Sequence, residues 1–158
     1  MANDNASKYD LNLTRILDAP RALVFKAWTD PKQVQQWWGP ACFTNPVCEI
    51  DPRPGGAMRI HMRGPDGTIY PMTGRYIELV EPERIVFTSG PTDADGKPLF
   101  EVLATVTFAD RDGKTELTLQ ARVTGMTDVA PQYLQGMNTG WNQTLDRLAN
   151  HVAGEKTQ

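Results

Sequence analysis

The C-terminal part of the chain carries one continuous apolar stripe. Apolar residues recur at steps of three or four positions after Pro131, which is the spacing of one face of a helix. The stripe consists of Leu134, Met137, Trp141, Leu145, Leu148 and Val152. A helix of about 22 residues, rising about 1.5 Å per residue, is about 33 Å long. We therefore expect one long helix that crosses the whole face of a sheet.

The sheet itself is indicated by residues 46 to 123, where apolar residues alternate with polar ones. The pattern predicts strands over 46–51, 57–63, 68–80, 84–90, 100–110 and 114–123. The connecting stretches, such as "RPGG", "GPDG" and "DRDG", are rich in the residues of tight turns. Residues 9–17 add an opening strand that is apolar on one side. We expect seven strands in antiparallel hairpins.

Two short helices are predicted between the opening strand and the rest of the sheet. The first has Asp18 or Ala19 as its N-cap and Pro20 in its first turn, where the missing amide costs nothing. The second is capped by Asp30, begins with Pro31 and ends at the Gly-Pro of "WWGP".

Composition narrows the class of protein. A chain of 158 residues fits one domain, and a net charge of -3 gives no reason to expect nucleic acid as a partner. The first residues lack both a basic start and an apolar run, and no stretch approaches a membrane span. We expect a cytoplasmic protein whose two cysteines, Cys42 and Cys48, are reduced.

The sequence offers little for catalysis through a metal or a nucleotide. "CFTNPVC" has only Glu49 and Asp51 beside it as further metal ligands, and "PGGAMR" opens a strand where a phosphate loop would open a helix. Two histidines in the whole chain give no convincing Ser-His-Asp arrangement. We expect no metal and no cofactor.

Four phrases of the sequence, in this order, resemble one known family. They are "APRALVFKAWTDPKQVQQWWGP", "GGAMRIHMRGPDG", "GRYIELVEPERIVFT" and "GWNQTLDRLANHV". The chain is similar, from about Tyr9 to Val152, to the activator-of-Hsp90-ATPase-homologue-like family of the START-like (SRPBCC) superfamily.

The resemblance implies an α+β helix-grip fold, in which a curved seven-stranded antiparallel sheet wraps round a long C-terminal helix. It implies one START-like domain over residues 9–153, with a flexible N-terminus at 1–8 and a flexible tail at 154–158.

The resemblance also implies three functions. START-like relatives bind lipids, steroids, polyketides or plant hormones in a cavity between sheet and helix, some act there as cyclases, and the eukaryotic namesake stimulates a chaperone ATPase. We favour a non-catalytic binder of a small apolar or amphiphilic molecule. The alternatives are a chaperone-interaction module, and a cyclase or hydrolase that uses Glu78 or Tyr76 as acid or base. A homodimer stays open.

Candidate ligand-binding residues follow from the inward faces of these elements. In "AMRIHMR" the alternation places Met58, Ile60 and Met62 on one face. The full set consists of Trp38, Met58, Ile60, Met62, Met72, Tyr76, Glu78, Phe87, Val102, Met137 and Trp141. Methionine suits an adaptable binding site, but it equally suits an irregular core.

Several of these residues have an ordinary structural alternative. Trp38 is predicted to be a flap and Trp141 a wall of the cavity, although a buried tryptophan more often only packs. Glu78 is either a polar group inside the cavity or a solvated residue near a strand end. Gly136 and Gly140 on the long helix, like Gly74 on the sheet, mark either close backbone contact, which we favour, or room for a ligand.

Overall fold

The computed structural model describes residues 10–93, 95, 97, 100–124 and 130–156, without the side chains of 10, 124, 130–136 and 155–156. Its elements, in chain order, are β1 (Asp10–Leu17), α2 (Arg21–Thr29), α3 (Pro31–Trp37), β2 (Thr44–Ile50), β3 (Ala57–Arg63), β4 (Ile69–Val80), β5 (Arg84–Pro91), β6 (Glu101–Arg111), β7 (Lys114–Thr124) and α4 (Ala130–Lys156). The order of strands and helices is the predicted one. The strand boundaries agree with the prediction to within two residues.

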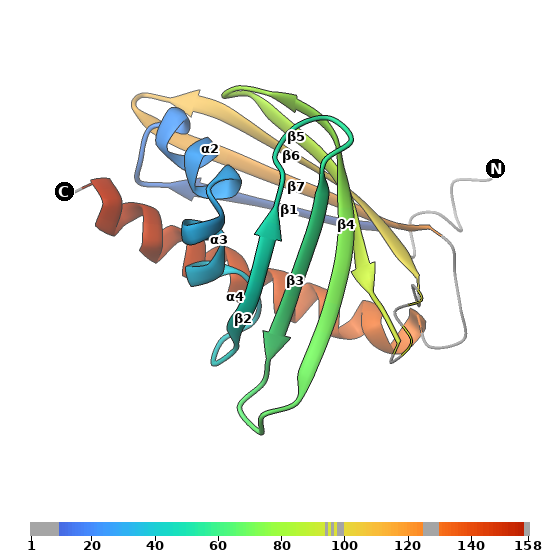
Figure 1. Cartoon of the computed structure of the whole chain (residues 1–158). Coiled ribbons are helices and arrows are strands. Elements are labelled where there is room, and N and C mark those ends of the chain that lie inside the picture. The colour runs from blue at the N-terminus through green and yellow to red at the C-terminus, as the bar shows by residue number, and fades with distance from the viewer. Residues whose placement is uncertain (1–9, 94, 96, 98–99, 125–129, 157–158) are drawn as a thin grey trace.

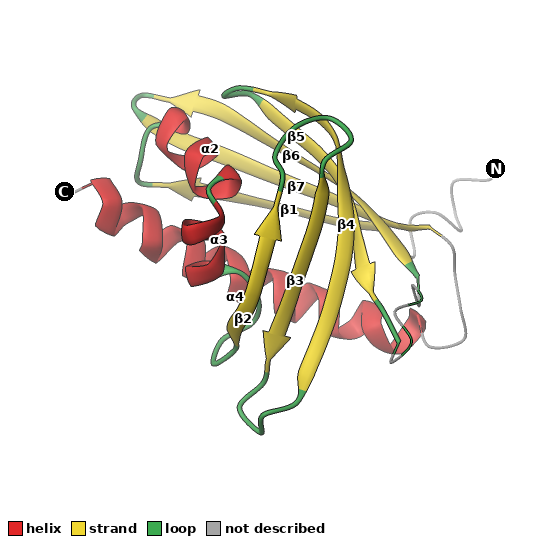
Figure 2. Cartoon of the chain, in the orientation of Figure 1, coloured by secondary structure: helices red, strands yellow, loops and turns green. Residues whose placement is uncertain are grey.

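The strands form one curved antiparallel sheet in the order β1-β7-β6-β5-β4-β3-β2. Every neighbouring pair is joined through a hairpin except β1 and β7, which pair across almost the whole length of the chain. The sheet curves round α4, and α2 and α3 cover the end of the sheet nearer the C-terminus of α4 (Figures 1 and 2). This is the α+β helix-grip fold that the sequence predicts.

The interior of the protein lies between the concave face of the sheet and the three helices. On α4, the side chains of Leu145, Leu148 and Val152 are fully buried against it. Trp37 anchors α3 there, because its Nε1 donates to the Ala27 carbonyl oxygen at 3.1 Å.

The helix ends correct two predictions. The N-cap of α2 is Pro20, whose extended backbone leaves its carbonyl free to accept from the amides of Leu23 and Val24 at 3.0 and 3.1 Å. Asp30 caps α3 as predicted, accepting from the Lys32 amide at 3.1 Å. At the C-terminus α4 runs to Lys156, so residues 154–156 belong to the helix and not to a tail. Residues 1–8 lie outside the described part of the chain.

Candidate ligand-binding pocket

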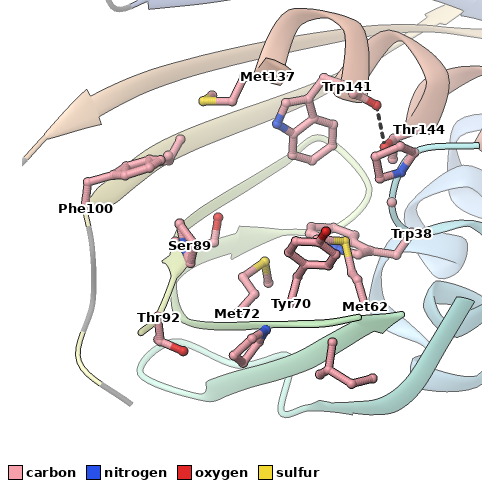
Figure 3. Close-up of a pocket in the computed structure, with 18 of the residues that line it drawn as sticks. Trp38, Met62, Tyr70, Met72, Ser89, Thr92, Phe100, Met137, Trp141 and Thr144 are labelled. Atoms are coloured by element: carbon pink, nitrogen blue, oxygen red, sulfur yellow. Dashed lines mark hydrogen bonds between the residues drawn. The ribbon is translucent and has the colours of Figure 1, made fainter. Parts of the chain in front are cut away.

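A pocket of about 660 Å³ lies between the sheet and the first half of α4. The loop after α3, strands β3 to β6 and α4 all contribute to its wall, and most of the side chains that line it are apolar. Figure 3 shows Met137 and Trp141 of α4 facing Met62, Tyr70 and Met72 of the sheet across this space. A volume of this size falls within the range of about 300–1,000 Å³ typical of small-molecule sites.

Two tryptophans form one end of the pocket. The rings of Trp38 and Trp141 lie 5.4 Å apart at 79°, an edge-to-face arrangement that is favourable for aromatic pairs. Trp141 also stacks on the buried Trp28, at 6.3 Å and 14°. Trp38 is buried, whereas Trp141 is only half-buried because one side of its ring faces the pocket. The two rings therefore separate the pocket from the closed core behind them.

The loop that carries Trp38 is held to α4 by Arg147. The guanidinium donates at 2.9–3.0 Å to a set of backbone carbonyl oxygens at the end of α3 and in the loop: those of Gln36, Trp38, Gly39 and Pro40. Burial lowers the pKa of Arg147. The neighbouring Gln143 accepts from the Ala41 amide at 3.0 Å. Side chains of α4 thus fix the backbone that forms one rim of the pocket.

Six of the side chains predicted for the site line the pocket: Trp38, Met62, Met72, Val102, Met137 and Trp141. Four others lie in the closed core, because α2 and α3 fill the space on their side of the sheet: Met58, Ile60, Tyr76 and Phe87. Burial also raises the pKa of Tyr76 well above its ordinary value. A pocket position for these four residues is therefore wrong, although they do face inward.

Glu78 lies outside the pocket because of a β-bulge. Tyr76 pairs with Phe87, but Glu78 pairs with Val86, so Ile77 is an extra residue on β4. One extra residue turns the following side chains to the opposite face of the sheet. Glu78 accordingly points outward and accepts from Arg84 Nε at 2.7 Å, which lowers its pKa. Of the two alternatives for Glu78, a position inside the cavity beside Tyr76 is wrong, and a solvated position near the strand end is confirmed.

Gly74 and Gly140 differ in how much free space surrounds them. A Cβ on Gly74 would lie 2.1 Å from the Thr88 carbonyl oxygen, so this glycine permits close backbone contact. A Cβ on Gly140 would meet only the Pro40 ring, at 3.6 Å, and Gly140 lines the pocket. Close contact is thus confirmed for Gly74, whereas Gly140 leaves room. The side-chain position of Gly136 lies outside the described residues.

Sequence reasoning missed part of the wall. Ser89 follows Phe87 on the inner face of β5, and Phe100 precedes Val102, so the same alternation of strand residues could have identified both. Thr92 and Asp93 follow the end of β5, where the alternation of strand residues no longer applies. Tyr70 also lines the pocket and packs on Phe43 at 5.8 Å between ring centroids.

Few of the side chains in the described wall of the pocket are polar. Asp93 is the charged residue of its described wall, and its Oδ1 accepts from the amides of Asp95 and Lys97, both at 2.9 Å. No group of His, Cys, Asp and Glu side chains in the described part of the chain could hold a metal ion. Cys42 and Cys48 are not paired with each other, and burial raises the pKa of Cys48 to about 11.

A curved antiparallel sheet that grips a long C-terminal helix defines a single-domain START-like protein. Within that class, the chain belongs to the family described as Activator of Hsp90 ATPase homolog 1-like protein, whose model matches residues 18–153.

Solved structures agree with this assignment. Protein CV1439 from Chromobacterium violaceum is 31% identical, with a TM-score of 0.78 over 92% of this chain and 97% of that one. Protein NE0264 from Nitrosomonas europaea is 24% identical, with a TM-score of 0.80 over 96% of this chain and 99% of that one. At that identity the second likeness establishes the fold alone. No curated protein matches the sequence significantly.

Among the helices of the described residues, none has both the length and the apolar character needed to cross a membrane.

Proposed function

We propose that the protein binds a small apolar or amphiphilic molecule, without changing it, in the pocket under α4. The observation that supports this is a space of about 660 Å³ whose wall is built from aromatic rings, thioethers and aliphatic chains. Such a wall gives affinity through burial of apolar area, and the few polar groups orient the ligand. The arrangement of Met62, Met72 and Met137 round the space suits ligands of more than one shape, because their side chains are flexible and polarisable.

A catalytic role has less support in the arrangement of polar groups. Tyr76 is closed off in the core and Glu78 is paired with Arg84 on the outer face. Neither side chain lines the pocket, so neither could act there as the acid or base of a cyclase or hydrolase.

Binding can be tested with Nile red, an uncharged dye whose emission shifts to the blue in apolar surroundings. We expect the wild type to bind it at one site, and Gly140→Leu to bind it about tenfold or more weakly, since the new side chain would occupy the pocket. The matched control is Gly154→Leu on the same helix, where a Cβ has no neighbour within 4 Å. Both variants should remain folded, because leucine is a better helix former than glycine.

Two results would contradict the proposal. One is a wild type that does not bind the dye, and the other is a Gly140→Leu variant that binds it as tightly as Gly154→Leu.

A second candidate function comes from the family description, which names an activator of a chaperone ATPase. In this alternative the outer surface binds the chaperone and the pocket is incidental. An ATPase assay with purified Hsp90 tests it. Stimulation that is unchanged in Gly140→Leu would favour binding of the chaperone through the outer surface, and stimulation lost in that variant would connect the activity to the pocket.

The cytoplasmic location and a homodimeric state remain predictions that fractionation and light scattering can test.

A further inference from the structure

The described wall of the pocket has no positively charged side chain. Arginine, lysine and histidine are all missing from the residues that line it, and the charged side chain that it does have is Asp93. Between 94 and 136, the side chains that the structure does not describe include no Arg, Lys or His in the sequence either. A carboxylate or phosphate entering this space would find no counter-ion and would approach a negative charge.

The backbone of α4 does not replace a cation. The amides that a helix leaves free belong to its first turn, and α4 begins at Ala130. Among its described side chains, those that line the pocket start at Met137, two turns further along. There the amides already donate to carbonyls within the helix. Favourable interaction between the helix dipole and an anion is therefore weak at this point.

Neutral polar groups are present at one end of the pocket. Ser89 and Thr92 are both buried, each 8% exposed, and their hydroxyls have no hydrogen-bond partner among the described residues. Figure 3 shows them on the side of the pocket near Phe100, away from Trp38 and Trp141. A hydroxyl can donate and accept, so these two hydroxyls suit an alcohol, a phenol or a carbonyl group.

We propose that the pocket selects uncharged amphiphiles, with the polar group against Ser89 and Thr92 and the apolar body against the rings of Trp38 and Trp141, and that it rejects carboxylates. This inference rests on the proposed function, since it specifies which molecules the same pocket accepts. It excludes ionised fatty acids as ligands and favours alcohols and phenols of the same size. Burying an unpaired carboxylate is far more costly than burying a hydroxyl that finds a partner.

Two matched pairs of probes test the charge preference at neutral pH. 9-Anthracenemethanol is compared with anthracene-9-carboxylate, and 1-dodecanol with dodecanoate. Binding is followed by tryptophan emission, because Trp38 and Trp141 lie in the wall. In each pair the neutral compound should bind about tenfold or more tightly than the anion.

A charge variant sharpens the test. Ile69 lines the pocket and is 40% exposed, so a lysine is tolerated there and supplies the missing cation. Ile69→Lys should bring the two members of each pair to within about threefold. Ile77→Lys is the control: it lies on the same strand, is 50% exposed and does not line the pocket, and it should keep the wild-type preference.

The outcomes separate the two proposals. If alcohol and carboxylate bind the wild type equally, or if Ile77→Lys changes the ratio as much as Ile69→Lys, the selection for uncharged ligands is wrong while the binding function stands. If no probe binds the wild type and Nile red does not bind either, the binding function and the selection are both wrong.

Discussion

The two ends of α4 meet the same sheet in different ways. Towards its C-terminus, Leu145, Leu148 and Val152 are completely buried in a closed core. Further towards its N-terminus, Met137 and Trp141 are only half-buried and face the pocket. The helical stripe is continuous in the sequence, so the difference does not come from α4. It comes from what lies between the helix and the sheet.

At the closed end the space is filled by the side chains of α2 and α3. Phe25 and Trp28 of α2 pack edge-to-face on Phe108 of the sheet, at 5.6 and 6.4 Å between ring centroids. Trp37 of α3 joins them against Trp28 at 4.8 Å. In the described part of the chain, no further helix fills the space between α4 and the sheet at the open end (Figure 1). A curved sheet and one straight helix leave a space wherever no third element fills it.

The largest expected effect comes from truncating one side chain at each end. Phe108→Ala removes a ring that is 2% exposed and surrounded by packed aromatics, and should lower the free energy of unfolding by about 3–5 kcal/mol. Met137→Ala removes a side chain that already faces a space, and should lower it by about 1 kcal/mol or less. Urea denaturation measures both. Equal losses would mean that the open end is packed as tightly as the closed end.

The sequence predicts the sheet and the long helix α4 well. Period two in the strands and period 3.6 in α4 each follow from burial of one face, and both patterns are strong here. The same patterns also identified which side chains point inward, with Met62, Met72, Val102, Met137 and Trp141 among those that line the pocket.

These sequence patterns cannot predict how much of the interior the side chains of α2 and α3 fill. Met58 and Ile60 point inward just as Met62 does, yet only Met62 reaches the pocket, because residues far away in sequence cover the other two. The β-bulge at Ile77 is a second limit. It reverses the alternation after Tyr76 without any Gly or Pro to mark it, so simple alternation places Glu78 on the inner face whereas the structure has it on the outer face.

A smaller effect is expected from a close backbone contact between β4 and β5, beside the pocket. Gly74→Ala would place a Cβ 2.1 Å from the Thr88 carbonyl oxygen, so β4 and β5 must separate locally. We expect a loss of about 2–3 kcal/mol in the free energy of unfolding. Thermal denaturation would reveal it, with Gly140→Ala as the comparison, since a Cβ on Gly140 meets only Pro40 at 3.6 Å and should stabilise the helix. The opposite order of the two variants would overturn the assignment of these glycines.

A loss of stability smaller than that of Phe108→Ala or Gly74→Ala is expected where the closed and open ends meet, at Arg147. Arg147→Met keeps the aliphatic length of the side chain but leaves the carbonyl oxygens of the loop after α3 without their donor. Because the group is partly exposed, water replaces some of these hydrogen bonds, and we expect a loss of only about 1–2 kcal/mol. Since Trp38 and Pro40 line the pocket, the freed loop should weaken Nile red binding by about threefold or more.

The control for this variant is Arg15→Met. Arg15 also joins another element to α4, donating to Asp146 Oδ1 at 2.8 Å and Asn142 Oδ1 at 2.6 Å, but it does not touch the loop. It should lower stability by a similar or smaller amount and leave dye binding unchanged. If both variants weaken binding equally, the pocket depends on the position of α4 as a whole. If only Arg147→Met does so, the position of the loop sets the rim, and the hydrogen bonds of Arg147 are what keep the loop in place at the boundary between the closed and open ends.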